Sequence, residues 1–476
     1  MSEIHLYSTA AQTQKSPQTS EESRAFDILA AQKQYYASGA TRPIAFRKKM
    51  LRELKKAIVK NDELICSALM SDLHKHPYET YMCETGLVLE EIEHHLSHLS
   101  RWSARRLVMP SMAQLPGICF AAPEPYGSVL IMAPWNYPIQ LCFMPLIGAI
   151  SSGNCAVIKP SAYAPSSSHA VRTIVESVFP PEYVAVVEGG REENKALLEA
   201  DFDYIFFTGS AGVGRSVMES AARRLIPVTL ELGGKSPVIV DETADIRLAA
   251  RKIAFGKVLN AGQTCVAPDY LLIHESVKER FIDEYKRALG EFFPNGDMSD
   301  MVHIVNAKHF ERLRGVLESG HAVIGGKVDP ESRFIEPTLL TDLAPDSPAM
   351  SREIFGPILP VISYSELDEC IEYIRARPKP LALYFFSQSA EAQKKLLGSC
   401  SFGGGCINDT IMHLANSNAA FGGVGASGMG SYHGKQSFDT FSHYRTVLEK
   451  HSPADVTIRY FPYSQKKAKL ARKILG

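Results

Sequence analysis

The sequence predicts an α/β protein in about three parts. Apolar runs of strand length alternate with helical patterns from about residue 126 to residue 240, which is the pattern of a parallel, doubly wound sheet. A second α/β region follows from about 233 to 430. At 476 residues the chain is too long for one compact core, and typical domain sizes suggest roughly three domains. The apolar fraction of 45% and the charged fraction of 22% are those of an ordinary soluble globular protein.

The chain opens with a helical region and then becomes extended. From about residue 22 to residue 104, apolar residues recur three and four apart with charges between them. After Pro110 proline and glycine become frequent, and 126–134 predicts a buried strand that runs into a loop. The further elements expected are strands at 156–159, 184–187, 203–208, 228–232, 237–240, 270–273 and 381–386, and a helix at 164–178. The end of the chain predicts another extended stretch and a basic tail.

Charge and cysteine content exclude several classes of protein. Lys plus Arg (51) nearly equals Asp plus Glu (52), so no global charge favours nucleic acid or an anionic membrane. The nine cysteines include no CxxC pair, which is neither a disulfide framework nor a zinc site and indicates a reducing compartment. They stand at positions 66, 83, 119, 142, 155, 265, 370, 400 and 406.

No targeting or membrane-spanning segment is expected. The first twenty residues are polar, and they lack both the apolar core of a signal peptide and the Arg-rich pattern of a transit peptide. The longest apolar run, 139–150, is shorter than the ~18–20 residues of a membrane helix and is broken by Pro145 and Gly148. These features predict a cytoplasmic protein.

The segment NAGQTC (260–265) is the most informative part of the chain. It places the Cys265 thiol among small and polar residues, in a turn that Gly262 can bend. Most cysteines are small buried core residues, and this is the expectation for the other eight. A core thiol rarely sits in such a turn, so Cys265 is a candidate nucleophile. An unperturbed thiol has a pKa near ~8.5, so it needs activation by a base or by its surroundings.

Two upstream segments supply partners for such a nucleophile. Glu231 ends the apolar run VTLEL and precedes two glycines, so burial should raise the pKa of its carboxyl group to suit a general base. Asn136 lies between two prolines in PWNYP, and its amide can donate to an oxyanion. Taken alone, Glu231 reads as a strand-end glutamate paired with Lys235, and Asn136 as a turn residue. Together with Cys265 they predict acyl-transfer chemistry at an aldehyde carbon.

A glycine-rich loop predicts a cofactor. The segment FTGSAGVGR (207–215) follows a strand and opens a helix, where main-chain N–H groups can bind a pyrophosphate. Its GxxGxG spacing is not the usual GxGxxG, and a tight strand-to-helix turn is the alternative. Lys159, at the end of another strand, could reach an adenosine ribose or could be a solvated strand-end lysine.

These motifs, in this order, resemble those of the aldehyde dehydrogenase superfamily. The matching segments lie between about residues 25 and 450 and are PWN (134–136), KPS (159–161), FTGS (207–210), ELGGK (231–235), GQTC (262–265) and EIFGP (353–357). The sequences AGQTCVAPDY (261–270), FGGVGASGMGSYHGK (421–435) and SFDTFSH (437–443) resemble the class 3 branch, which acts on fatty and aromatic aldehydes.

The resemblance implies a role for each matching residue. Cys265 would attack the aldehyde, Asn136 and the Cys265 main-chain N–H would hold the oxyanion, and Glu231 would activate the water that hydrolyses the thioester. Hydride would pass to NAD or NADP. The cofactor-binding residues would be Trp135, Lys159, Gly209, Ser210, Gly214, Glu353 and Phe355. No metal is implied.

The resemblance also implies a domain arrangement. A Rossmann-like NAD(P)-binding domain would comprise 22–104 and 125–232, and an α/β catalytic domain 233–430. A small β bridging element, 105–124 and 431–455, would join a second copy in a homodimer, and 456–476 would form a basic tail.

One position departs from the family pattern. Many NAD-preferring relatives carry a glutamate directly after the KPS segment, where it binds the ribose hydroxyls, but this chain has Ala162. Loss of that carboxylate removes a hydrogen-bond acceptor for NAD and a repulsion against the 2′-phosphate of NADP. We therefore expect NADP to be used as well as NAD.

Two other functions fit the same fold. An acylating enzyme would pass the thioester to coenzyme A, but such relatives generally lack a base at the position of Glu231. A non-catalytic binding protein would not need Cys265, Glu231 and Asn136 together. For the substrate, the class 3 branch implies medium- to long-chain aliphatic or aromatic aldehydes in an apolar pocket, with His413 and the loop 411–420 as candidates by position.

Two basic clusters are interpreted as solvent-facing helix surfaces. His94, His95 and His98 have a spacing that could bind a metal, but a solvated helix face is the expectation. The C-terminal stretch is basic and amphipathic and could touch an anionic membrane, although a solvated terminal helix is expected. Its residues are Lys466, Lys467, Lys469, Leu470, Arg472, Lys473, Ile474 and Leu475.

Overall fold

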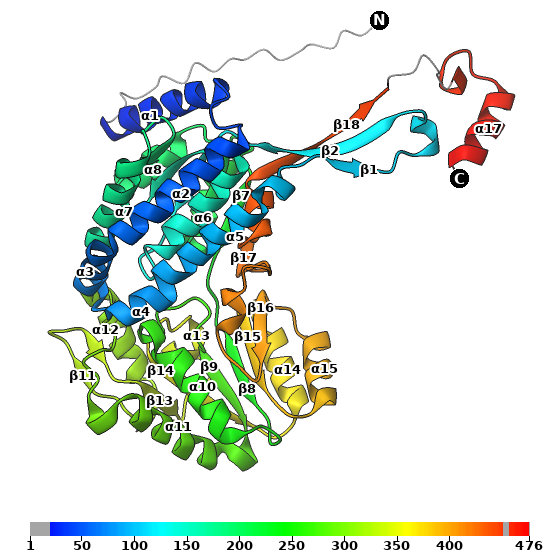
Figure 1. Cartoon of the computed structure of the whole chain (residues 1–476). Helices are drawn as coiled ribbons and strands as arrows, with labels where there is room; N and C mark the ends of the chain where they lie inside the picture. Colours follow the sequence, from blue (N-terminus) through cyan, green and yellow to red (C-terminus); the bar gives the residue numbers. More distant parts are fainter. Residues whose placement is uncertain (1–19, 451–456, 476) are drawn as a thin grey trace, which may run out of the picture.

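The computed structural model describes residues 20–450 and 457–475, which form two sheet-containing bodies and a projecting arm (Figure 1). The polar residues 1–19, in which no targeting signal is expected, lie outside the described residues, as do residues 451–455 of the predicted bridging element. Within the described part of the chain, no helix combines the length and the apolar character needed to cross a membrane.

The first body is built on a six-stranded sheet with the order β17-β7-β6-β3-β4-β5. Neighbouring strands run parallel except for β17, which is antiparallel to β7. The strands are β3 (Ser128–Met132), β4 (Cys155–Lys159), β5 (Val184–Val186), β6 (Tyr204–Thr208), β7 (Val228–Glu231) and β17 (Gly428–Met429). The prediction of a parallel sheet between 126 and 240 is confirmed, because β3 to β7 lie within one or two residues of the expected strands.

Helices cover both faces of this sheet, because successive side chains of each strand point to opposite sides. In β3, Val129 and Ile131 join a core with α2, α5, α6 and α7, whereas Leu130 and Met132 join a second core with α1, α8 and α9. The helices are α1 (Ser20–Ala37), α2 (Ile44–Lys60), α5 (Gly86–Trp102), α6 (Gln140–Ser152), α7 (Pro165–Val178), α8 (Arg191–Glu199) and α9 (Ala211–Ala222). Between α2 and α5 lie α3 (Asp62–Leu73), α4 (Pro77–Thr80) and the π-helix η1 (Tyr81–Thr85).

Two features of this body differ from the sequence interpretation. Pro145 does not break the apolar run 139–150, because α6 continues through it and every residue of that helix is buried. The interpretation of a solvated histidine face is wrong for His95, which is fully buried. Its ring nitrogens lie 2.6 Å from Ser151 Oγ and 3.1 Å from Glu91 Oε1, so the polar ring is satisfied inside the core.

The second body contains a seven-stranded sheet with the order β10-β13-β14-β9-β8-β15-β16. The edge strand β10 is antiparallel to β13, and all other neighbouring strands of this sheet are parallel to each other. Its strands are β8 (Pro237–Val240), β9 (Tyr270–His274), β10 (His321–Ile324), β13 (Thr338–Thr341), β14 (Ile358–Tyr364), β15 (Ala382–Phe386) and β16 (Gly404–Ile407). Its helices are α10 (Ile246–Val258), α11 (Lys278–Phe292), α12 (Ala307–Leu317), α13 (Pro348–Ser351), α14 (Leu367–Arg375) and α15 (Ala390–Ser399), and a small ribbon pairs β11 (Val328–Asp329) with β12 (Phe334–Ile335). The three strands expected in this region are present as β8, β9 and β15.

The arm is a three-stranded antiparallel sheet that projects away from both bodies (Figure 1). It pairs β2 (Ile118–Pro125) with β1 (Arg106–Val108) and with β18 (Ser442–Glu449), and the short helix α16 (Lys435–Thr440) precedes β18. The basic helix α17 (Gln465–Leu475) lies near the far end of the arm. Leu107 and Met109 are 75% and 91% exposed, so the arm presents apolar side chains that the described residues leave uncovered.

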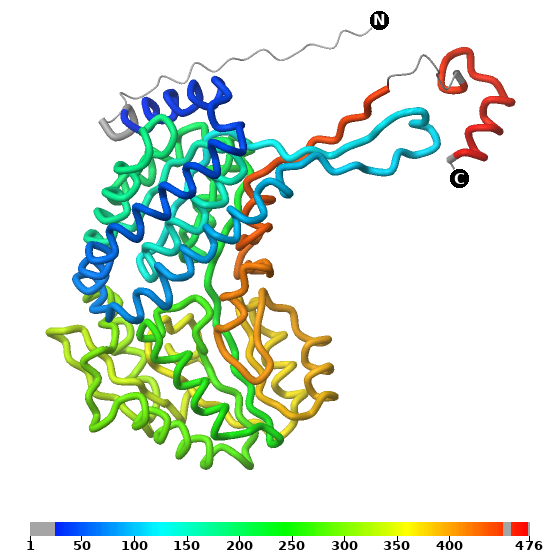
Figure 2. Tube along the Cα trace, viewed as in Figure 1, coloured from blue at the N-terminus to red at the C-terminus, as the bar shows by residue number. Residues whose placement is uncertain are grey.

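The two connections between the bodies run close together. The chain leaves the first sheet after β7 and returns at β17 (Figure 2), and these two strands pair with each other. In that pairing Gly428 stands opposite Glu231, the last residue of β7. The predicted base is therefore placed where the chain crosses from one body to the other.

Candidate active site

The turn that carries Cys265 follows α10 and has an unusual backbone. Asn260 and the residue after it both have φ of 51°, and Gly262 has φ of 67°, so three consecutive residues adopt the left-handed conformation. A Cβ atom on Gly262 would overlap the carbonyl oxygen of Gly356. Only glycine fits there, which agrees with the sharp turn expected from the sequence.

Hydrogen bonds lock this turn to the loop that carries Asn136. The Asn136 Nδ2 atom donates to the carbonyl oxygen of Gln263 at 3.0 Å. In return, the Asn260 Nδ2 atom donates to the carbonyl oxygen of Asn136 at 2.9 Å and to that of Gln263 at 3.0 Å. A side-chain amide has two N–H donors, so Asn136 keeps a second one for another acceptor.

Glu231 is a buried carboxyl group with no ion-pair partner in 20–450 or 457–475. Its side chain is 2% exposed, and neither carboxyl oxygen has a hydrogen-bond partner among the described residues. Burial raises the pKa of Glu231 well above its ordinary value. The alternative in which Glu231 pairs with Lys235 is wrong, because the Lys235 ammonium instead bonds to the Asp269 carboxylate.

The surroundings of Cys265 disfavour the thiolate form of its side chain. Burial raises its pKa to about 12, and the nearby carboxyl groups of Glu353 and Glu231 add to this effect. The thiolate is the nucleophile, so reaction requires a base to take the thiol proton as the sulfur attacks.

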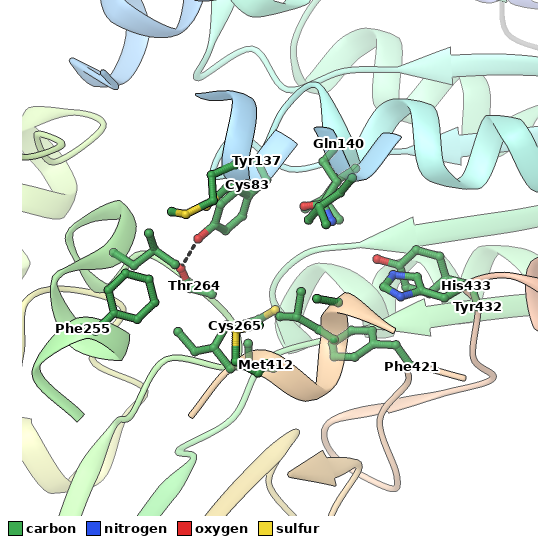
Figure 3. A pocket seen from close by; sticks show the side chains of 18 residues that line it. Cys83, Tyr137, Gln140, Phe255, Thr264, Cys265, Met412, Phe421, Tyr432 and His433 are labelled. Atoms are coloured by element: carbon green, nitrogen blue, oxygen red, sulfur yellow. Dashed lines mark hydrogen bonds between the residues drawn. The ribbon is translucent and has the colours of Figure 1, made fainter. Parts of the chain in front are cut away.

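An apolar cavity of about 190 Å³ lies on one side of Cys265. Most of its wall is aliphatic or aromatic, including Leu141, Phe255, Met412 and Phe421. Figure 3 shows Cys265 within this ring of side chains, with the Tyr137–Thr264 hydrogen bond on one side and Tyr432 and His433 on another.

A second cavity of about 250 Å³ shares Cys265 with the first. Its wall includes Asn136 and Glu231 together with five of the predicted cofactor residues, which are Trp135, Gly209, Ser210, Glu353 and Phe355. The Phe355 ring meets the Trp135 ring edge to face at 5.4 Å between centroids. Burial raises the pKa of Glu353 to about 8, with a further contribution from Asp269.

The glycine-rich loop leads into α9 beside this second cavity. The Ser210 Oγ atom caps the helix by accepting from the Val213 N–H at 3.5 Å. A Cβ atom on Gly209 would lie 2.6 Å from the Phe207 ring, so the tight turn requires glycine. The helix N-terminus therefore presents main-chain N–H groups at the edge of the cavity.

Two predicted cofactor residues, Lys159 and Gly214, are not part of the cavity wall. Lys159 is 3% exposed, so the solvated alternative is wrong, and its Nζ atom donates to the carbonyl oxygens of Pro160 at 2.8 Å and Gly189 at 2.7 Å. A Cβ atom on Gly214 would lie 2.6 Å from the Leu232 side chain, so this glycine allows α9 to pack against the end of β7.

A sequence model of the aldehyde dehydrogenase family matches residues 5–447, which is most of the chain. The chain belongs to the aldehyde dehydrogenase family. Members of this family generally use NAD or NADP.

Individual relatives place this aldehyde dehydrogenase in the class 3-like branch. It is 48% identical to 4,4'-diaponeurosporen-aldehyde dehydrogenase of Staphylococcus aureus, over 91% of this chain and 95% of that protein. It is 42% identical to aldehyde dehydrogenase family 3 member B1 of Homo sapiens, over 93% of this chain and 96% of that protein.

Solved structures agree with the assignment. The substrate-bound state of Staphylococcus aureus AldH matches with a TM-score of 0.92 and 46% identity, over 94% of this chain and 99% of that one. An NAD+ complex of an aldehyde dehydrogenase from Bacillus cereus matches with a TM-score of 0.82 and 25% identity, over 90% and 89%. The chain is thus an enzyme that oxidises aldehydes.

The structure of this aldehyde dehydrogenase adds residues that the motifs did not indicate. Arg312, His309 and Arg352 line the second cavity, and the Arg312 guanidinium donates to the carbonyl oxygen of Ile354 at 2.7 Å. In the loop 411–420, four residues line the apolar cavity, which are Ile411, Met412, Leu414 and Ala415. His413 itself does not, because its ring turns toward Cys406, 3.7 Å from that sulfur. A periodic signal could not separate these neighbours, because the 3₁₀ helix η6 (Met412–Ala415) is only four residues long.

The described residues contain no cluster of side chains that could bind a metal ion. Across 20–450 and 457–475, no group of three or more His, Cys, Asp or Glu side chains is arranged to hold a metal ion. His94 and His98 instead stack near Trp102, with ring centroids 5.5 Å and 5.4 Å from the indole.

Proposed function

We propose that this aldehyde dehydrogenase converts apolar aldehydes to carboxylic acids through a thioester on Cys265 that is hydrolysed with Glu231 as general base. The observation that carries the proposal is the position of Cys265 in the walls of both cavities. One cavity is apolar and suits the hydrocarbon part of an aldehyde. The other contains Glu231, Asn136 and the predicted cofactor residues.

In the first step, the Cys265 sulfur attacks the aldehyde carbon, and the carbonyl oxygen becomes an oxyanion. The thiol proton passes to one of the two carboxyl groups that act on the thiol, Glu231 or Glu353. The free Asn136 N–H and the Cys265 main-chain N–H hold the oxyanion. Asn136 suits this task because its other N–H is already fixed to Gln263.

In the second step, a water molecule attacks the Cys265 thioester and passes a proton to Glu231. The carbon–sulfur bond then breaks, which releases the carboxylic acid, and Glu231 returns its proton to the sulfur, which restores the thiol. Glu231 suits this role because its carboxyl group is desolvated and unpaired, so its raised pKa makes it a stronger base than an exposed glutamate.

The second cavity fits a nicotinamide cofactor, NAD or NADP. When bound, this group accepts the hydride that leaves the substrate carbon. Glu353 offers buried carboxylate oxygens to ribose hydroxyls, Phe355 and Trp135 offer aromatic surfaces, and Gly209 with Ser210 opens a helix N-terminus toward phosphate. Lys159 is proposed to reach the adenosine ribose, since two main-chain carbonyls leave one of its three N–H donors free. Gly214 is proposed to affect cofactor binding indirectly, because it allows α9 to pack against the end of β7.

The substrate class follows from the apolar cavity. Its wall offers few polar atoms, so aldehydes with a medium or long alkyl chain or an aromatic ring gain most from leaving water. Polar aldehydes of the same size gain less. We expect kcat/KM to rise from acetaldehyde to hexanal, mainly through a lower KM.

Replacing Asn136 with alanine is expected to lower kcat by about 10²–10³, because one preorganised donor to the oxyanion is lost. Initial rates of nicotinamide reduction with hexanal measure this. The KM for NAD should change little, and a loss confined to that constant would assign Asn136 to cofactor binding instead.

The NAD/NADP ratio tests the departure at Ala162. The wild type should use both cofactors, and Ala162→Glu should raise the KM for NADP by about tenfold or more, because the new carboxylate repels the 2′-phosphate. Ala162→Gln has the same shape without the charge and is the matched control. Negligible use of NADP by the wild type would contradict the argument.

Hexanal with NAD, in the absence of coenzyme A, is the primary assay. Steady turnover supports the hydrolytic reaction. A single turnover that becomes continuous only when coenzyme A is added would support the acylating alternative, and binding of the cofactor without any turnover would support a non-catalytic role.

We also propose that the protein is a cytoplasmic homodimer joined through the arm. The exposed apolar side chains of the arm, including Leu107 and Met109, support this proposal. The helix α17 is basic, a character that suits an anionic membrane surface, but we favour a solvated terminal helix over a membrane contact. Sedimentation of the purified chain tests the dimer.

A further inference from the structure

Three charged side chains from one short segment lie behind the proposed active site. Lys75, Glu79 and Glu84 belong to the segment 75–84, which contains α4 and most of the π-helix η1. Lys75 and Glu84 are both fully buried and form an ion pair at 2.5 Å. A buried ion pair is costly to desolvate, so its presence calls for an explanation in the contacts that it makes.

The Lys75–Glu84 pair is bonded to the loop that carries Asn136. The Lys75 Nζ atom donates to the main-chain carbonyl oxygen of Asn136 at 3.3 Å and lies 4.4 Å from the centre of the Tyr137 ring. The Glu84 Oε2 atom accepts the N–H groups of Ile139 at 2.8 Å and Gln140 at 3.3 Å. The pair therefore holds the loop at the Asn136 carbonyl and in the four residues that follow it.

Glu79 is bonded to the turn that carries Cys265. Its Oε1 atom accepts the main-chain N–H of Asn260 at 2.8 Å. Asn260 is the first left-handed residue of that turn, and its side chain donates to the carbonyl oxygen of Asn136. The segment 75–84 thus contacts both the loop that carries Asn136 and the turn that carries Cys265.

We propose that Lys75, Glu84 and Glu79 are positioning residues that hold the Asn136 amide in register with the Cys265 sulfur. This rests on the proposed role of Asn136 as oxyanion donor. The Asn136 carbonyl is fixed by Lys75 and Asn260, so the peptide cannot rotate, and the side-chain amide keeps its direction. Catalytic donors lose their effect when displaced by a fraction of an ångström to about one ångström. Neither Lys75 nor Glu84 lines the cavities, so they act through Asn136 rather than on the substrate.

A double-mutant cycle tests the proposal. The variant Lys75→Met/Glu84→Gln removes both buried charges together and leaves an acceptor for the Ile139 N–H. It is measured in the wild-type background and in Asn136→Ala, in two ways. One is kcat and KM with hexanal and NAD. The other is the rate of the p-nitrophenol burst from p-nitrophenyl acetate without cofactor, which reports Cys265 acylation.

The expected result is non-additive. In the wild-type background both rates should fall by about tenfold, with the KM for hexanal within about twofold. In the Asn136→Ala background the same double substitution should lower both rates by less than about twofold, because the donor that Lys75 and Glu84 position is already absent. Equal losses in both backgrounds would overturn the proposal while leaving the proposed function intact. No loss from Asn136→Ala alone would overturn both.

Arg47→Met is the matched control. The Arg47 side chain is a buried cation that donates to the carbonyl oxygens of Thr41 at 2.9 Å and Ser151 at 3.1 Å, and it does not touch either active-site loop. Its loss should lower stability and change the rates equally in both backgrounds. If the Lys75→Met/Glu84→Gln variant does not fold, Glu79 carries the test. Glu79→Ala should show the same non-additive loss, and Glu79→Gln, which keeps an acceptor for Asn260, should restore the rates. Failure of that restoration would overturn the proposal.

Discussion

Replacing Cys265 with alanine is expected to lower kcat for aldehyde oxidation by more than about a thousandfold. The sulfur is the only atom at the junction of the two cavities proposed to bond to the substrate carbon, and without it no thioester can form. The remaining donors and binding contacts give only residual acceleration. NADH formation with hexanal measures the loss.

Cofactor binding separates this effect from misfolding. Trp135 lines the second cavity, so quenching of its fluorescence by NAD should be the same in Cys265→Ala as in the wild type. Cys370→Ala is the matched control, because Cys370 is a buried core thiol in α14 and should leave kcat unchanged. A Cys265→Ala enzyme that retained turnover would refute the covalent mechanism.

The strands of the first body could be predicted because a parallel sheet covered on both faces needs apolar side chains in succession. Val129, Leu130 and Ile131 illustrate this, since alternate residues enter different cores and all are fully buried. The same logic revealed Glu231. A carboxylate at the end of such a strand is buried because the residues before it are buried.

The turn at Cys265 was predictable for a different reason. Local chemistry decides a turn, and Gly262 stands where any Cβ atom would overlap Gly356. The partner across the turn could not be foreseen, because it lies about ninety residues further along the chain.

The positioning residues could not be found from sequence patterns. Lys75 and Glu84 are charged residues in a helical region, and such residues usually face water. Glu84 lies in η1, which packs against α5 and α6, and Lys75 is buried beside it as its ion-pair partner. No local period encodes these contacts. His95 was misinterpreted for the same reason, since its partner Ser151 comes from α6. The cavity walls likewise combine segments from distant parts of the chain, so residues such as Phe255 and Tyr432 carry no signal of their role.

Replacing Glu231 with glutamine is expected to convert steady turnover into one rapid turnover followed by a rate about 10²–10⁴ lower, because the general base for thioester hydrolysis is lost. Glutamine has nearly the shape of the carboxyl group but cannot take a proton from water. Rapid mixing with hexanal and NAD should show a burst of about one NADH per active site. Hydroxylamine, which cleaves thioesters without a base, should restore continuous turnover.

The pH dependence gives an independent check on the same residue. Burial raises the pKa of Glu231, so its carboxyl group stays protonated, and inactive as a base, to a higher pH than an exposed glutamate. The steady rate of the wild type should therefore rise with pH through a range well above the ordinary glutamate pKa, and Glu231→Gln should lose that rise. If the first turnover of the variant is slowed as much as the later ones, Glu231 rather than Glu353 takes the thiol proton. The two carboxyl groups beside Cys265 can thus be assigned separately to acylation and hydrolysis.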